Sequence, residues 1–185
     1  MGFLDIFKPK KTVDKELLIA ADQGQPQAQF LLGAMYFYGQ GVPQNYEFAF
    51  HWIQKAAFQG LPEAQFNLGS MFYNGQGIRQ NYALAVQWWQ EAAEQGEPNA
   101  QFNLGKVYSN GNGVTLNYSI AAQWLQKAAD QGLPEAQFVL GLMFHDGIGV
   151  TPNYSLAVQL WQKAARQGHI KAKKLLKTKV ERLYG

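Results

Sequence analysis

The stretch Ala28-Gln29-Phe30-Leu31-Leu32-Gly33-Ala34-Met35-Tyr36 decides the fold, because close copies of it return every 36 residues. The Ala-Gln-Phe triplet recurs at residues 64–66, 100–102 and 136–138. In each copy a Leu-Gly pair follows after one intervening residue. A fixed period of 20–50 residues is typical of proteins built from stacked copies of one small structural unit.

Within this stretch, the apolar residues predict a helix. Ala28, Leu32, Met35 and Tyr36 stand at i, i+4, i+7 and i+8, which is one stripe of an α-helix. The small Ala28 and Gly33 would let a second helix approach this one closely. We therefore expect the stretch to form the first helix of a pair.

The residues that follow predict the second helix. Gly39 stands where the end of the first helix needs a left-handed residue, and Asn45 is a good N-cap. Gly60 and Pro62 end the second helix and start the next copy. The unit is then two antiparallel helices of about 12–14 residues. The tryptophans fall on the second helices at core spacing: Trp52, Trp88, Trp89, Trp124 and Trp161.

The copies define the organisation of the whole chain. Residues 13–24 match the second helix only, and residues 169–183 match the first helix only, as expected of half-repeats that cap a stack. We predict an all-α solenoid of ten helices over residues 13–183, after an N-terminal extension 1–12. The predicted full repeats are residues 25–60, 61–96, 97–132 and 133–168.

The complete pattern resembles the Sel1-like repeat, a relative of the tetratricopeptide repeat. It reads Ala-Gln-Phe-x-Leu-Gly-x-Met-Tyr/Phe-x-x-Gly-x-Gly-Val, then Asn-Tyr-x-x-Ala-x-x-Trp and Lys-Ala-Ala-x-Gln-Gly, over residues 13–176. The resemblance implies a right-handed α-solenoid whose first helices line a concave face. It also implies a scaffold or adaptor that grips a partner protein or peptide. Immunity proteins that neutralise toxins are an alternative within the same class, since some bacterial members have that role.

Composition and charge narrow the function further. The chain has no cysteine, which excludes disulfides and cysteine-bound metals, and its N-terminus does not resemble a secretory signal, so we expect a cytoplasmic protein. Six of its 16 basic residues lie in 169–185, and the preceding repeats are slightly acidic, which argues against a nucleic-acid groove. No cofactor and no small-molecule substrate are expected.

Positions that differ between the copies are free for a purpose other than packing. Three such columns on the first helix stand at i, i+3 and i+4, a single face that we expect to be the concave one. Along the chain this face changes from aromatic to polar, which would suit an extended peptide with an apolar end. Solvated surface residues are the alternative interpretation. The predicted partner-binding residues are Phe37, Tyr38, Ser70, Tyr73, Asn74, Lys106, Ser109, Asn110, Leu142, His145 and Asp146.

The constant phenylalanines of the first helices leave two interpretations open. They either pack between neighbouring first helices or form the floor of the binding groove. A residue that repeats in all four copies favours packing. These residues are Phe30, Phe66, Phe102 and Phe138.

Catalysis has little support in the sequence. The three histidines lie in different repeats, and no His-x-x-x-His pair exists for zinc. His145 and Asp146 are adjacent, but neighbours along a helix are not expected to face each other. Cysteine-rich members of the family are reported to bind or cleave β-lactams, and this chain lacks their cysteines. We therefore predict that the chain is not an enzyme.

The two ends have unusual composition. Phe3, Leu4 and Phe7 precede three lysines, so residues 1–11 could lie weakly on an anionic membrane, which makes a membrane-peripheral organiser an alternative function. A frayed or locally packed arm is the other interpretation of this segment. At the other end, an apolar stripe should dock on the fourth repeat and leave the lysines outside, as a solvated cap or a surface for an acidic partner. That stripe comprises Ala172, Leu175, Leu176, Val180 and Leu183, and the lysines are Lys171, Lys173, Lys174, Lys177 and Lys179.

Overall fold

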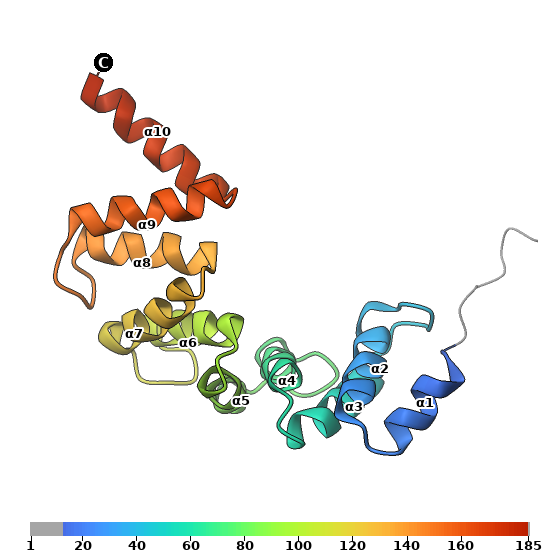
Figure 1. The fold of residues 1–185 in the computed structure, drawn as a ribbon. Coiled ribbons are helices and arrows are strands. Elements are labelled where there is room, and N and C mark those ends of the chain that lie inside the picture. The colour runs from blue at the N-terminus through green and yellow to red at the C-terminus, as the bar shows by residue number, and fades with distance from the viewer. Residues whose placement is uncertain (1–12, 185) are drawn as a thin grey trace, which may run out of the picture. The chain divides into compact units, whose positions relative to one another are not determined.

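The computed structural model describes residues 13–184 and, within them, the side chains of residues 13–178. This part of the chain contains ten α-helices and no strand (Figure 1). The predicted membrane-binding segment, residues 1–11, lies outside the described residues. None of the described helices is both long enough and apolar enough to span a membrane. The helices are α1 Lys15–Asp22, α2 Pro26–Tyr38, α3 Tyr46–Phe58, α4 Pro62–Asn74, α5 Tyr82–Glu94, α6 Pro98–Asn110, α7 Tyr118–Asp130, α8 Pro134–Asp146, α9 Tyr154–Arg166 and α10 Ile170–Tyr184.

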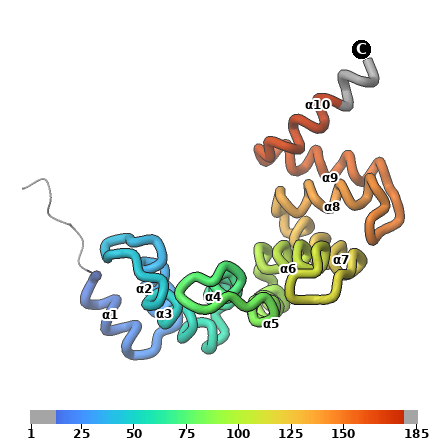
Figure 2. The backbone as a smooth tube through the Cα atoms, turned by 180° about the vertical axis from the view of Figure 1, so that it is seen from behind, coloured from blue at the N-terminus to red at the C-terminus, as the bar shows by residue number. Residues whose placement is uncertain are grey.

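The chain is an all-α solenoid of helical hairpins, as the repeat predicts. It divides into two compact units, unit 1 up to Trp88 and unit 2 from Trp89 onward, with the division inside α5. Within each unit, a helix packs chiefly on the helices just before and after it. The backbone trace shows α2 beside α3 and α8 beside α9 (Figure 2).

The expected capping residues close the helices. Asn45 accepts hydrogen bonds from the backbone N–H groups of Glu47 and Phe48 through its side-chain oxygen. Gly39 follows the last residue of α2 with φ 68°, a left-handed conformation that favours glycine. Pro62 is the first residue of α4, where its missing N–H costs nothing. Each of these predictions is confirmed.

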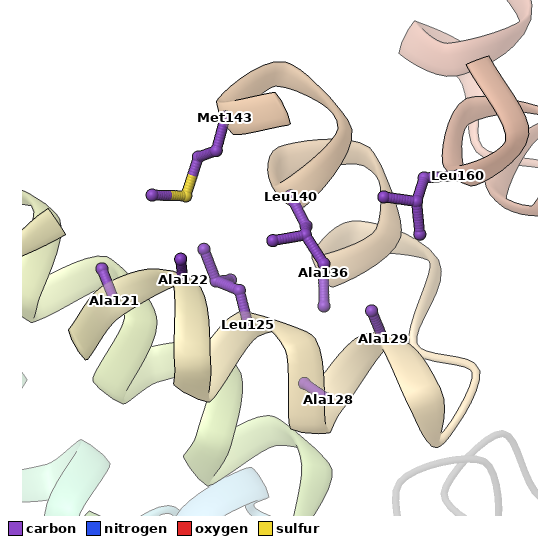
Figure 3. Packing of buried hydrophobic residues seen from close by; sticks show 9 residues of the cluster. All are labelled: Ala121, Ala122, Leu125, Ala128, Ala129, Ala136, Leu140, Met143 and Leu160. Carbon is purple, nitrogen blue, oxygen red and sulfur yellow. The ribbon is translucent and has the colours of Figure 1, made fainter. Parts of the chain in front are cut away.

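The core lies between the first and second helices of a pair and between successive pairs. In unit 2 it includes Leu125, Leu140 and Met143, which point toward one another between α7 and α8 (Figure 3). A β-carbon added to Gly105 would lie 2.5 Å from the Cγ atom of Leu125. The expected close approach of the second helix is therefore present, and it depends on the absence of a side chain at this glycine.

Of the five tryptophans predicted to be core residues, only two are fully buried. Trp89 and Trp161 are buried, while Trp52, Trp88 and Trp124 are only half-buried. The half-buried three stand one position earlier in their helices, about 100° of helix rotation from the buried position, and Trp52 packs against the core cluster of Ala21, Ala28 and Leu32. The ammonium groups of Lys55 and Lys127 lie over the rings of Trp52 and Trp124, at 4.5 and 4.1 Å from the ring centroids.

The glutamine of the Ala-Gln-Phe triplet joins successive repeats. Gln101 donates from Nε2 to the carbonyl oxygen of Ala93 (3.1 Å) at the end of the preceding second helix. Its own oxygen accepts from Nε2 of Gln131 (2.9 Å), which follows the next second helix. The four equivalent glutamines are the only buried polar residues among those described: Gln29, Gln65, Gln101 and Gln137.

The C-terminal helix docks as the apolar stripe predicts, over the part whose side chains are described. Ala172 is fully buried, and Leu175 and Leu176 pack against the buried Trp161 cluster. Val180, Leu183 and Lys179 belong to the same prediction, and their side chains lie outside the described residues. Four lysines of α10 are exposed: Lys171, Lys173, Lys174 and Lys177.

Candidate functional site

Each of the helices α2, α4, α6 and α8 carries one stripe of side chains that is not fully buried. In every case the stripe stands at i, i+3, i+4, i+7 and i+11, and its members are exposed or half-buried. We call these stripes the open face of their unit. In unit 1 the open face comprises Gln27, Phe30, Leu31, Ala34 and Tyr38 of α2 with Glu63, Phe66, Asn67, Ser70 and Asn74 of α4. In unit 2 it comprises Asn99, Phe102, Asn103, Lys106 and Asn110 of α6 with Glu135, Phe138, Val139, Leu142 and Asp146 of α8.

Large apolar side chains stand on the open face of unit 1. Leu31 is 53% exposed and Tyr38 is 64% exposed, while the next core residue along the same helix, Leu32, is fully buried. The Tyr38 ring touches the ring of Phe37 edge-on, with centroids 5.0 Å apart. These side chains are held in place by the helix and are not needed to fill its core.

The constant phenylalanines of unit 2 pack on the core and also line a hollow. All four constant phenylalanines of the chain are half-buried. Phe102 packs against the core cluster of α7 and α8, and Phe138 packs against that of α9 and α10. Both also line a hollow of about 500 Å³ that opens on the open face of unit 2. In unit 2, these rings therefore pack on the core with one side and form a surface with the other.

Seven of the predicted partner-binding residues lie on the open faces. Ser70 and Asn74 have local hydrogen bonds, since the hydroxyl of Ser70 donates to the carbonyl oxygen of Phe66 (3.0 Å). Lys106 extends over the ring of Phe102, with its Nζ atom 5.7 Å from the ring centroid. The seven are Tyr38, Ser70, Asn74, Lys106, Asn110, Leu142 and Asp146.

Three of the other four predicted residues contact the second helix of their own hairpin, and the fourth, Ser109, stands in the same column. The ring centroids of Phe37 and Tyr46 lie 5.2 Å apart, and those of Tyr73 and Tyr82 lie 4.9 Å apart. In unit 2, the Ser109 hydroxyl donates to the carbonyl oxygen of Gly105 (2.8 Å). His145 lies against the rings of Tyr154 and Trp161, at 5.8 and 5.5 Å. Phe37, Tyr73, Ser109 and His145 occupy the same position in successive repeats. Their identity varies because several different pairs of side chains can fill the seam, that is, the contact between the two helices of one hairpin.

Two columns of the open face were missed by the sequence reasoning. They begin the helix and comprise Gln27, Glu63, Asn99 and Glu135, followed by Leu31, Asn67, Asn103 and Val139. Their variation between copies was visible in the sequence, as was their spacing of three and seven residues from the column of Ser70 and Lys106. The expected change from aromatic to polar is also incomplete, because α8 presents Phe138, Val139 and Leu142.

The neighbouring pair His145 and Asp146 does make contact. The Nδ1 atom of His145 lies 2.5 Å from an oxygen of Asp146, contrary to the expectation that adjacent helical residues do not face each other. The pair forms the end of α8, whose last residue is Asp146. No group of three or more His, Asp and Glu side chains that could hold a metal occurs among the described residues.

Four successive matches to the Sel1 repeat cover residues 26–61, 62–97, 98–133 and 134–169. The chain belongs to the Sel1 repeat family. Sel1 repeats generally mediate protein–protein interaction, and the scaffold is typically non-enzymatic.

Solved structures of the family resemble this one closely. One is c5321, described as a protective antigen of uropathogenic Escherichia coli strains with an SLR fold, at 41% identity and a TM-score of 0.82 over 84% of this chain. Another is a Sel1 repeat protein from Oxalobacter formigenes, at 41% identity and a TM-score of 0.80 over 88% of this chain. The chain spans only 33% and 47% of these two proteins.

Two further similarities are more limited. The immunity protein Pa5087 from Pseudomonas aeruginosa has 24% identity and a TM-score of 0.55 over 84% of this chain and 58% of its own, a likeness in fold alone. The chitin synthase regulator SKT5 of Saccharomyces cerevisiae is 50% identical over 40 residues, which is 22% of this chain and 6% of SKT5.

Proposed function

We propose that this chain is a scaffold that holds a partner protein or peptide on the open face of its first helices. The observation that supports this most directly is the exposure of Leu31 and Tyr38. The other repeats carry asparagine or valine in place of Leu31, and asparagine or aspartate in place of Tyr38. Large side chains that are fixed by a helix and left exposed are favourable anchors, because their burial by a partner removes apolar surface from water without ordering a flexible chain.

The contrast between the constant and the variable columns supports the same site. The constant columns are occupied by helix packing, turns and the glutamine hydrogen bonds. In unit 1, the exposed Leu31 and Tyr38 stand in variable columns. A toxin-neutralising role is one form of this function, and the likeness to an immunity protein, being one of fold alone, does not choose that partner over another.

The test replaces the two anchors by the residue that other repeats carry at the same positions. In the variant Leu31→Asn/Tyr38→Asn, the new residues match Asn67 and Asn74 of the next repeat, so the fold should tolerate them. Affinity capture from a lysate of the source cells, with quantitative mass spectrometry, should then recover about tenfold less of the wild-type partner.

The matched control removes an equally exposed apolar side chain elsewhere in unit 1. Phe58 is 70% exposed on α3, away from the open face, and Glu94 occupies its position in the next repeat. Phe58→Glu should leave the recovery of the partner unchanged, and circular dichroism should show native helix content for both variants. Equal recovery with wild type and the double variant would show that this face of unit 1 is not the site.

A further inference from the structure

The hollow on the open face of unit 2 lies where α6, α8 and the start of α10 meet. Phe102 of α6 and Phe138 and Val139 of α8 form its apolar lining, together with Ile170, the first residue of α10. Ile170 is 79% exposed, more than any other large apolar side chain among those described. The volume of about 500 Å³ is enough for a bulky apolar side chain of a partner and the backbone around it.

The start of α10 departs from the other first helices in the residues that line this hollow. The first residue of α2, α4, α6 and α8 is a proline, and in α10 it is Ile170. The next residue is glutamine, glutamate or asparagine in those helices, and in α10 it is Lys171. The residue before the helix is His169, whose ring lies against Phe138 with centroids 4.7 Å apart. These changes make the hollow both more apolar and more basic.

The charges around the hollow are mostly positive. Lys171 lines it, and Lys174 lies one turn further along the same side of α10. On the other side, Lys106 extends over Phe102. Glu135 is the one carboxylate in the lining. No acidic residue occurs in the sequence between Asp146 and Glu181, so the field at this end of unit 2 attracts negatively charged groups.

We infer that this hollow binds an acidic peptide segment of the partner through one bulky apolar side chain. The apolar side chain packs on Phe102, Phe138 and Val139, and the flanking carboxylates face Lys171 and Lys106. Burial of the apolar side chain supplies most of the affinity, and the lysines select acidic over basic sequences. The inference rests on the proposed function and names the chemical class of the partner segment.

The experiment uses the full chain and defined peptides. A fluorescein-labelled heptapeptide with a central phenylalanine between three acidic residues on each side is titrated and followed by fluorescence polarisation. A peptide with alanine in place of the phenylalanine should bind about tenfold more weakly, and a peptide with lysines in place of the acidic residues should bind more weakly still. Amide chemical shifts in NMR spectra should change at Phe102, Phe138 and Ile170.

Two variants of the hollow and two matched controls test which side chains bind the peptide. Each substitution introduces the residue that another repeat carries at the same position. Val139→Asn introduces the residue of Asn103, and Lys171→Glu introduces that of Glu135. Each should weaken the binding of the acidic phenylalanine peptide about threefold or more. The controls, Ile148→Asn and Lys163→Glu, change exposed residues outside the hollow to those of Asn112 and Glu91, and should leave binding unchanged.

Several results would overturn the inference. Equal affinity for the phenylalanine and alanine peptides would mean that charge alone acts. If no peptide binds at about 1 mM, the hollow does not take an acidic segment of this kind. Sedimentation with phosphatidylserine vesicles that is lost in Lys171→Glu but retained in Val139→Asn, without peptide binding, would assign the basic surface to a membrane. If partner capture still depends on Leu31 and Tyr38 in any of these cases, the proposed function stands and only the inference fails.

Discussion

At the scale of single residues, Gln101 explains why a polar side chain is kept in an otherwise apolar core. The residue is 4% exposed, and its amide bridges two carbonyl or amide groups that belong to different second helices. The carbonyl oxygen of Ala93, in the last turn of α5, accepts both from the backbone N–H of Gly96 and from this amide. A glutamine can satisfy a donor and an acceptor at once.

Replacing this side chain should therefore destabilise the repeat array. We expect Gln101→Leu to lower the free energy of unfolding by about 1–3 kcal/mol, because two hydrogen bonds between repeats are lost, one to the carbonyl oxygen of Ala93 and one from the amide of Gln131. Urea denaturation followed by circular dichroism measures the change. Gln90→Leu makes the same chemical change at an exposed site and should cost less than about 0.5 kcal/mol. Similar losses for both variants would contradict the bridging role.

At the scale of elements, the loop between the two helices of a hairpin is fixed by the preceding repeat. Gly149 has φ 71°, and a β-carbon at this position would lie 2.4 Å from the backbone oxygen of Tyr118, at the start of α7. The hydroxyl of Ser119 also donates to the carbonyl oxygen of Gly149 (3.2 Å). Gly77 and Gly149, the second glycines of their Gly-x-Gly loops, thus allow a close approach to the preceding second helix as well as a turn.

Two glycine substitutions separate these contributions. Gly132 has φ 91° and nothing within 4 Å of an added β-carbon, so Gly132→Ala should cost only the strain of a left-handed residue, about 1–2 kcal/mol. Gly149→Ala should cost clearly more, because the loop must also move away from α7. The difference between the midpoints of thermal unfolding of the two variants measures the cost of the contact between the added β-carbon and α7. Equal midpoints would mean that the loop relaxes without loss.

The C-terminal helix differs from the other first helices at the position of closest packing. Lys177 stands in α10 where Gly33, Gly69, Gly105 and Gly141 stand in α2, α4, α6 and α8. At Gly105 an added β-carbon already lies too close to Leu125. A helix could therefore not pack on α10 at Lys177 as closely as α7 packs on α6.

At the scale of the whole molecule, the contacts are local in sequence. The element pairs in extensive contact are consecutive helices, such as α6 with α7 and α7 with α8. In a fold of this kind, stability is approximately a sum over repeats and their nearest-neighbour interfaces. A substitution that destabilises one repeat should therefore lower the protection of amide hydrogens from exchange first in that repeat and its neighbours.

Hydrogen exchange tests this locality. Gly105→Ala forces a β-carbon against Leu125 and should destabilise unit 2 by about 1–3 kcal/mol. Mass spectrometry of amide exchange should show faster exchange in α6 and α7, with α2 and α3 of unit 1 almost unchanged. Exchange that accelerates equally in all helices would show that the chain unfolds as one cooperative unit.

The sequence by itself determined the period, the helix ends and the family. Gly39, Asn45 and Pro62 act through local backbone conformation and nearby hydrogen bonds, so their roles can be read from residue type and spacing alone. The stripe of Ala28 and Leu32 was equally clear, because helical periodicity fixes which residues share a face.

Only the tertiary structure decided how two neighbouring side chains divide between core and surface. Trp88 and Trp89 are identical and adjacent, yet one is half-buried and the other 3% exposed, because about 100° of helix rotation separates them. The same rotation places Phe37 in the seam of its hairpin and Tyr38 on the open face. Variation between copies marks both positions alike, and only the position of the packed second helix tells them apart.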